Sequence, residues 1–248
     1  MSSRWDFKPA KDLGMDPLRR MRHERREAGL LEYITQFGAR CAVRSYMALW
    51  HRAAVENAHH VPQTTPFVFC ANHTSHLDSV VLGSVLPWRV RRNTFPLAAG
   101  DVFFETPVLT ALAAFCINAL PMWRKNVGRH ALDALRSRLV EERCAYILFP
   151  EGKRSEDGTL LPFKAGVGMM IAGTDIPVVP AYIHGAHAAM PRTATLPRPK
   201  KLRVTIGAPL HFRDTTNDAE GWRTIAARVR EAVRELGGVK EETAGARP

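Results

Sequence analysis

The sequence predicts an α/β domain: a mostly parallel, twisted sheet flanked by helices, preceded by an N-terminal amphipathic helical segment. Short apolar runs of strand length recur along the chain, namely FVFCA, AYILF, IPVVPAYIHG and KLRVTIGAPL. Segments whose apolar residues recur at helical spacing separate several of these runs. Strands that alternate with helices are typical of a parallel sheet whose two faces are covered by the helices.

The chain of 248 residues, 46% of them hydrophobic, is long enough to bury one large core. We expect residues 1–60 to form a helical, membrane-docking segment, residues 61–237 the α/β domain, and residues 238–248 a disordered tail. Between Leu30 and Trp50, apolar residues recur at helical spacing beside arginines. This helix either packs on the core or lies in the headgroup layer of a membrane.

The remaining elements follow from local patterns. A strand begins at Phe67 and leads into a helix that Thr74 or Ser75 can cap. We expect the apolar stretch from Pro107 to Trp123 to be a buried or membrane-facing helix, because its two prolines and polar residues do not suit a span. Two further amphipathic helices are indicated by apolar stripes: Leu132, Leu135 and Leu139 in the first, and Trp222, Ile225, Val229, Val233 and Leu236 in the second.

The charge balance points to an acidic partner. The chain has 35 Lys and Arg against 24 Asp and Glu, a net charge of +11. Nucleic acid, an anionic bilayer and phosphorylated substrates all remain open, as does the simpler interpretation of solvated surface charge. The basic residues gather in four clusters, at 19–27, 89–92, 123–129 and 197–203.

The cysteines indicate a reducing compartment. Cys41, Cys70, Cys116 and Cys144 lie far apart without a C-x-x-C pair, so we expect small buried apolar residues. No apolar segment follows the basic start, so we predict no secretory signal and a cytoplasmic location.

The first group of chemically active residues is His73 and Asp78, five positions apart just past the first strand. On one continuous helix they would lie about 140° apart, so they can meet only if the chain turns between them. A strand-to-helix turn brings Asp78 back beneath the imidazole. The carboxylate would hold one ring nitrogen and leave the other to take a proton from an alcohol.

Three other interpretations of this segment compete. His73 and Asp78 could be a surface histidine and a helix cap. His73, His76 and Asp78 could ligate a metal, although no further strong ligand lies nearby. Ser75 or Ser79 could be a covalent nucleophile, although the chain has no G-x-S-x-G elbow.

A second strand, AYILF, ends in a charged turn. Cations at the carboxyl end of a strand are well placed to receive a phosphate group, because ligands of open α/β sheets bind at that edge. A surface turn with solvated charges is the alternative. The residues concerned are Glu151, Gly152, Lys153 and Arg154, with Lys164 a little later.

NHTSHLD, followed some seventy residues later by FPEGKRS, resembles the glycerolipid acyltransferase family, whose best-known members are 1-acylglycerol-3-phosphate acyltransferases. The family's H-x-x-x-x-D and F-P-E-G-x-R-S motifs are both intact. VVPAYIHG, with Pro180, resembles the fourth motif, and the resemblance extends from about Pro66 to Leu210. The second motif departs from the family, because Trp123 stands before Arg124 where an Asp or Asn is usual.

The resemblance implies that His73 is the general base and Asp78 its orienting partner. It also implies a site for the acceptor's phosphate at Arg124, Glu151, Gly152 and Arg154, to which we add Lys153 and Lys164 on electrostatic grounds. The implied reaction moves an acyl group from acyl-CoA or acyl carrier protein to the hydroxyl of 1-acylglycerol-3-phosphate, giving phosphatidic acid. It needs no metal or other cofactor, and backbone N–H groups near Gly152 or after His73 are candidates for stabilising the oxyanion.

An enzyme of this kind acts at a bilayer. We therefore expect peripheral or monotopic binding to the anionic, cytoplasmic side of the membrane, where each well-placed cation contributes ~1 kcal/mol. Other acceptors, such as an amino-acid lysolipid or a glycolipid, stay open because of Trp123. So does an inactive scaffold. Dispersed charge without interleaved aromatic residues argues against a nucleic-acid-binding protein, and the sequence predicts neither the donor carrier nor the oligomeric state.

Overall fold

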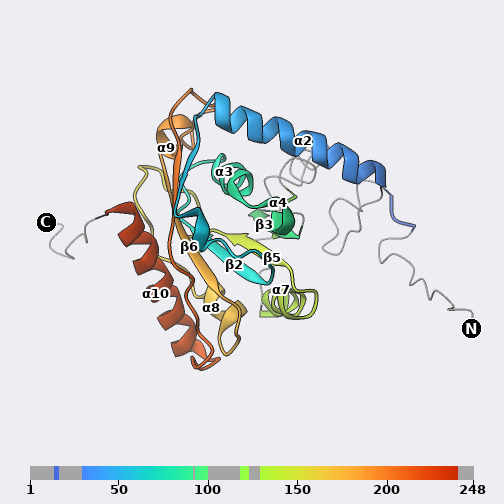
Figure 1. The fold of residues 1–248 in the computed structure, drawn as a ribbon. Coiled ribbons are helices and arrows are strands. Elements are labelled where there is room, and N and C mark those ends of the chain that lie inside the picture. Colours follow the sequence, from blue (N-terminus) through green and yellow to red (C-terminus); the bar gives the residue numbers. More distant parts are fainter. Residues whose placement is uncertain (1–13, 17–29, 92, 100–117, 123–128, 240–248) are drawn as a thin grey trace, which may run out of the picture.

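The computed structural model describes residues 14–16, 30–91, 93–99, 118–122 and 129–239 (Figure 1). The strands are β1 (Ala54–Glu56), β2 (Phe67–Ala71), β3 (Thr94–Ala99), β4 (Leu120–Met122), β5 (Ala145–Leu148), β6 (Val178–His184) and β7 (Arg203–Ile206). The helices are α2 (Leu30–Leu49), α3 (Asp78–Val85), α4 (Trp88–Arg91), α7 (Arg129–Glu141), α8 (Gly166–Ile171), α9 (Ala186–Ala189) and α10 (Ala219–Gly237).

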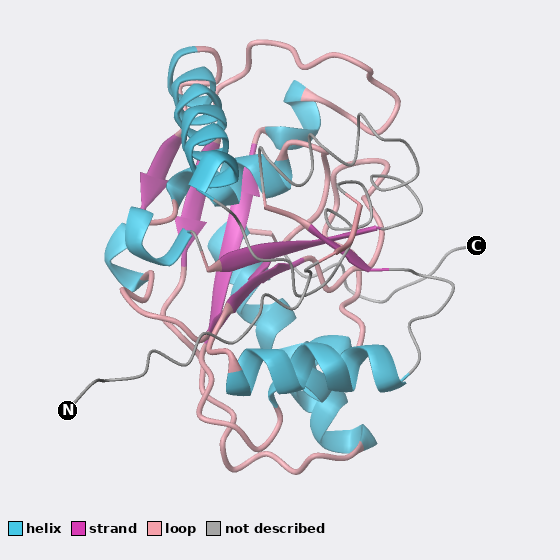
Figure 2. Ribbon diagram, turned by 90° about the vertical axis from the view of Figure 1, so that its right-hand side faces the viewer, coloured by secondary structure: helices cyan, strands magenta, loops and turns pink. Residues whose placement is uncertain are grey.

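The strands form one sheet in the order β1-β7-β6-β2-β5-β3-β4. Neighbouring strands run parallel except β6 and β7, which are antiparallel. Figure 2 shows the strands fanning across one another, the twist common to such sheets. The predicted α/β class with a mostly parallel sheet is confirmed.

Helices cover both faces of the sheet (Figure 1). On one face α2, α3 and α4 pack over Phe67, Phe69 and Ile147. On the other face α7, α8 and α10 pack over Val68 and Tyr146. Alternate residues of β2 and β5 therefore enter opposite cores, which explains why both strands are continuous apolar runs in the sequence.

The N-terminal segment takes part in this fold. The predicted amphipathic helix is present as α2, and its Met47 is only 1% exposed within the core. Strand β1, inside the segment that we assigned to residues 1–60, pairs with β7. The membrane-docking role of the segment and the disordered tail stay predictions. Within the described residues, no helix combines the length and the apolarity needed to cross a bilayer.

Two sequence predictions are wrong in part, and one strand was not predicted. Leu120–Met122, expected at the end of a helix, form β4, while most of the Pro107–Trp123 stretch lies outside the described residues. Strand β3 was not predicted; it contains Pro96, a residue that normally argues against an interior strand. Cys41 is exposed on α2 rather than buried, although Cys70 and Cys144 are buried as expected. Cys116 lies outside the described residues.

Asn72 carries the sheet's hydrogen bonding one residue past the end of β2. Its amide Nδ2 donates to the carbonyl of Ile183 at 3.2 Å, and its Oδ1 accepts from the N–H of Ile183 at 2.7 Å. The side chain is buried. It fixes the point from which the next residue, His73, leaves the sheet.

We predict that Asn72→Ala lowers the free energy of unfolding by about 2–6 kcal/mol, because two buried backbone groups of Ile183 lose their partner at about 1–3 kcal/mol each. Denaturant unfolding measures the change. Asn217→Ala is the control: it removes an exposed hydrogen bond to Trp222 and should cost under about 1 kcal/mol. Equal effects of the two substitutions would contradict this account.

Candidate active site

The turn between β2 and α3 brings His73 and Asp78 together. His73 follows the end of β2, and Asp78 is the first residue of α3. His73 Nδ1 and Asp78 Oδ2 lie 2.9 Å apart. The predicted return of the carboxylate beneath the imidazole is therefore present in the structure.

The Asp78 carboxylate also organises the backbone of the turn. Its Oδ2 accepts from the N–H of Thr74 at 2.7 Å and from that of Ser75 at 2.8 Å. Our expectation that Thr74 or Ser75 caps the helix is wrong: α3 begins three residues later, and no side chain caps its N-terminus. The Ser75 hydroxyl instead accepts from the N–H of Leu77 at 3.1 Å.

These contacts decide which nitrogen of His73 carries the proton. A carboxylate oxygen only accepts hydrogen bonds, so in the neutral ring Nδ1 donates to Asp78. No described residue bonds to the other nitrogen, Nε2, and the imidazole is 22% exposed. The ring stacks on Phe149, with centroids 4.3 Å apart and planes 18° apart. His73 is thus held on one edge and one face, and Nε2 keeps a lone pair for a substrate proton.

Glu151 joins the FPEGKRS segment to this turn through the backbone. Its Oε1 accepts from the N–H of His73 at 2.7 Å, and its Oε2 accepts from the N–H of Leu161 at 3.2 Å. In return, the N–H of Ser155 donates to the carbonyl of His73 at 2.8 Å. Both backbone groups of His73 are therefore fixed by residues of the FPEGKRS segment. The buried carboxylate of Glu151 faces backbone N–H groups, and its part in phosphate binding stays a prediction.

Gly152 and Lys164 lie against each other. Gly152 has a φ of 72°, and a Cβ at this position would stand 2.7 Å from Lys164 Nζ. A side chain here would be strained and would displace the ammonium group. The N–H of Gly152 donates to the carbonyl of Phe149 at 3.1 Å, so this candidate for stabilising the oxyanion is already engaged.

The other predicted cations are placed less fully. Lys153 is exposed at the turn, and Arg154 is half-buried. Arg124, like Trp123 before it, lies outside the described residues.

His76 lies in the same turn but is a neutral group. Burial, and then the positive charge of Arg154, lower its pKa to about 4. Arg154 therefore carries positive charge close to the catalytic turn. Within the described part of the chain, no group of three His, Cys, Asp or Glu residues could hold a metal ion.

Residues 52–184 match the acyltransferase family, and this region is more than half of the chain. The chain belongs to the acyltransferase family. Its His73–Asp78 turn and its FPEGKRS turn both lie inside the matched region.

Two curated relatives show how far the likeness of this family member extends. It is 30% identical over 131 residues to human 1-acyl-sn-glycerol-3-phosphate acyltransferase alpha, covering 52% of this chain and 44% of that protein. The chain is also 30% identical over 145 residues to the chloroplastic 1-acyl-sn-glycerol-3-phosphate acyltransferase BAT2 of Brassica napus. This match covers 57% of this chain and 40% of that protein. The chain thus spans less than half the length of these relatives.

A solved structure supports the fold. The 1-acyl-sn-glycerophosphate acyltransferase PlsC of Thermotoga maritima superposes with a TM-score of 0.61 at 22% identity, covering 86% of this chain and 82% of that one. At this identity the likeness concerns the fold.

Sequence reasoning missed three residues that position the site of this family member. Asn72, Phe149 and Ser155 all stand beside or within the two motifs. Their place in the motifs was a signal. Asn72 bonds to the backbone of β6, Phe149 stacks on the His73 ring, and Ser155 donates to the His73 carbonyl. The spacing of residues along the chain cannot identify such partners.

We predict a pH-dependent stability effect at Glu151. Burial raises its pKa from the ordinary 4.5 to about 8, although the N–H groups of His73 and Leu161 oppose this. Between these values the folded state holds a proton that the unfolded state has released, so stability falls as pH rises. Wild type should lose stability relative to Glu151→Gln from about pH 4.5 to about pH 8. Thermal unfolding across this range measures it, and a constant difference would contradict the shift.

Proposed function

We propose that this protein transfers a fatty acyl group from a thioester donor to the free hydroxyl of 1-acylglycerol-3-phosphate, giving phosphatidic acid. The observation that carries the proposal is the His73 imidazole, which is bound at Nδ1 by Asp78 and available at Nε2. This arrangement is suited to a general base. Family membership supports the reaction class, and the names of the curated relatives support this choice of acceptor.

The reaction follows from the orientation of the imidazole. Nε2 of His73 takes the proton of the acceptor hydroxyl as its oxygen forms a bond to the thioester carbonyl carbon. The oxyanion then collapses, the carbon–sulfur bond breaks, and the imidazolium returns the proton to the leaving thiolate. Asp78 stabilises the imidazolium between these steps. Coenzyme A or acyl carrier protein leaves as the thiol, and no step calls for a metal, another cofactor or a covalent acyl-enzyme.

Cations around the turn after β5 are suited to the acceptor's phosphate. Lys164 packs over Gly152, and the charge of Arg154 acts on His76 beside the base. Lys153 is exposed at the same turn. We propose that these groups, together with Arg124, hold the phosphate while His73 reaches the hydroxyl. Profiling of lysolipid acceptors tests this choice, and a preference for a phosphate-free lysolipid would overturn it.

We further propose that the protein docks peripherally on the cytoplasmic face of the membrane. At the end of α2, Leu49 is 81% and Trp50 is 48% exposed. The loop at 191–203 contains the 77% exposed Leu196 among lysines and arginines. His51 ties the two segments together, because its carbonyl accepts from Leu202 N at 3.0 Å. Apolar side chains among cations suit an anionic bilayer surface.

The same loop reaches the catalytic region. Arg192 forms an ion pair with Glu156, which follows the FPEGKRS turn. His187 of α9, the helix that precedes the loop, also contacts the carbonyl of Glu156, through Nε2 at 3.0 Å. A bilayer bound at this loop would therefore lie close to the chain segment that we propose binds the acceptor.

We predict that His73→Ala lowers the rate of acyl transfer by on the order of 10²–10⁴-fold, the usual contribution of a general base. Thiol release from acyl-CoA, with lysophosphatidic acid in mixed micelles, measures the rate. His211→Ala, which removes an exposed histidine, should leave it unchanged. Acceptor-dependent thiol release that survives in His73→Ala would contradict the proposal.

We predict that replacing Leu49, Trp50 and Leu196 together by serine reduces co-sedimentation with phosphatidylglycerol vesicles several-fold, because apolar area leaves the interface. Val140→Ser, which removes a 49% exposed residue of α7, is the matched control and should bind as wild type does. Equal binding of the triple variant and the control would argue against this docking surface.

A further inference from the structure

An aromatic ring covers one face of the His73 imidazole. Phe149, the residue that directly follows β5, lies nearly parallel to it, with ring centroids 4.3 Å apart and planes 18° apart. The imidazole therefore lies over the π face of Phe149 and not against its edge. Any charge that the imidazole acquires during the reaction is held over that face.

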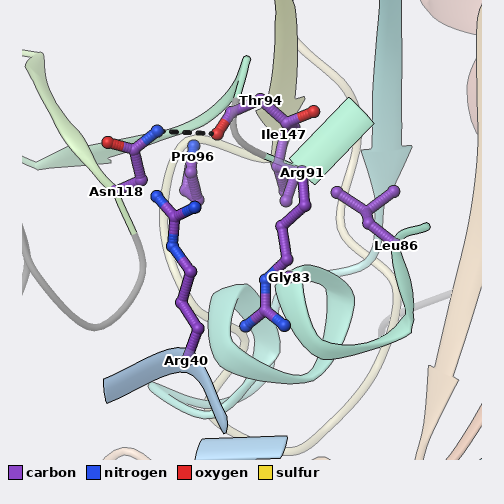
Figure 3. A pocket seen from close by; sticks show the side chains of 8 residues that line it. All are labelled: Arg40, Gly83, Leu86, Arg91, Thr94, Pro96, Asn118 and Ile147. Atoms are coloured by element: carbon purple, nitrogen blue, oxygen red, sulfur yellow. Dashed lines mark hydrogen bonds between the residues drawn. The ribbon is translucent and has the colours of Figure 1, made fainter. Parts of the chain in front are cut away.

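The Phe149 ring is fixed by the core beneath the helices. It is 8% exposed and belongs to the same apolar cluster as Leu77 and Ile147. Figure 3 shows Ile147, two residues earlier in the chain, beside a small pocket between α2, α3 and α4. The carbonyl of Phe149 accepts from the N–H of Gly152 at 3.1 Å, which fixes the start of the turn. The ring is thus packed in place before a substrate binds.

The stack interacts differently with the two charge states of His73. The face of a benzene ring carries partial negative charge and attracts a cation that lies within about 6 Å of the ring centroid. The imidazole is neutral before Nε2 takes the proton of the acceptor hydroxyl and is an imidazolium afterwards. The attraction is therefore gained as the proton is transferred, which is when an interaction accelerates the reaction.

Burial of the same face has the opposite effect, because an apolar surface disfavours the charged ring. The His73 side chain is 22% exposed, so it is only partly withdrawn from water. A leucine in place of Phe149 would still cover the imidazole with apolar atoms but would have no π face. Comparison of phenylalanine with leucine at this position therefore separates the attraction from the burial.

The charged and titratable groups around the imidazole come from the same two turns. Asp78 bonds to Nδ1 of His73, and Glu151 accepts from the N–H of His73. His76 interacts electrostatically with Arg154, His73 and Asp78. All of these groups stay in place when only the stacked ring is changed. A difference between variants of that ring therefore reports the stack itself.

We propose that Phe149 is a positioning residue that stabilises the imidazolium form of His73 through its π face. The inference rests on the proposed role of His73 as the general base, and it deepens that role. Asp78 stabilises the charged ring at its edge, and Phe149 stabilises it at its face. Phe149 thereby makes His73 a stronger base toward the acceptor hydroxyl.

The first test is an NMR titration of the His73 ring, which needs no substrate. Phe149→Leu should move the midpoint of this titration to lower pH by about half a pH unit, the size expected of one cation–π contact. Phe212→Leu is the matched control. Phe212 is 9% exposed and packs in the core on the other face of the sheet, so its replacement should leave the midpoint unchanged.

A second variant keeps the shape of the ring. Difluorophenylalanine in place of Phe149 preserves the packing, while its fluorine atoms withdraw electrons from the π face and weaken its attraction for a cation. The midpoint should shift in the same direction as in Phe149→Leu, by a smaller amount. This variant tests the proposal even if Phe149→Leu does not fold.

The acyl-transfer assay gives a separate readout. In Phe149→Leu, kcat above the acid limb of the pH profile should fall about two- to fivefold, the factor that corresponds to one cation–π contact. The KM for the acceptor should not change, because the stack stabilises only a charge that forms during the reaction.

A midpoint that shifts to lower pH in both Phe149 variants, but not in Phe212→Leu, would establish the role of the stack. An unchanged midpoint in both Phe149 variants, or an equal shift in Phe212→Leu, would overturn it. The titration also separates this inference from the proposed function. If the midpoint shifts but wild type transfers no acyl group to lysophosphatidic acid, the stack is established and the proposed acceptor is wrong.

Discussion

The buried carboxylate of Asp78 is the constraint on which the catalytic turn depends. It accepts hydrogen bonds from His73 Nδ1 and from the N–H groups of Thr74 and Ser75. An unpaired carboxylate in a fully buried position would be costly, so the chain must bend to supply these donors. The bend lies between the end of β2 at Ala71 and the start of α3 at Asp78. The contact with Asp78 also fixes the tautomer of the imidazole. One interaction thus determines both the local fold and the chemistry that the turn can perform.

The parallel sheet explains why two distant segments form one site. Strands β2 and β5 are hydrogen-bonded neighbours that run in the same direction, so their carboxyl ends meet at one edge. His73 leaves the end of β2, and Glu151 follows the end of β5. Two hydrogen bonds, from His73 N to Glu151 and from Ser155 N to the His73 carbonyl, then lock the turns together. The position of the base is therefore set by the backbone as well as by Asp78.

The sequence predicted the features that follow from periodicity and motif. Strands β2, β5, β6 and β7 are apolar runs, and the need for a turn between His73 and Asp78 follows from helical geometry. Strand β3 was not predicted, and its Pro96 is a residue that normally argues against an interior strand. The contacts of Glu151 were not predicted, because an acidic residue in a basic turn suggests ligand binding. In the structure Glu151 accepts hydrogen bonds from the backbone N–H groups of His73 and Leu161. The burial of Arg91 arises from tertiary packing, whereas the sequence left solvated surface charge open for the 89–92 cluster.

The central claim is that Asp78 holds His73 with its proton on Nδ1 and its lone pair on Nε2. The most direct measurement is the ¹⁵N NMR spectrum of the His73 ring in its neutral form, in wild type and in Asp78→Asn. The account predicts that wild type is the Nδ1–H tautomer and that Asp78→Asn loses this preference. A wild-type ring protonated mainly on Nε2, or a preference unchanged by Asp78→Asn, would contradict it.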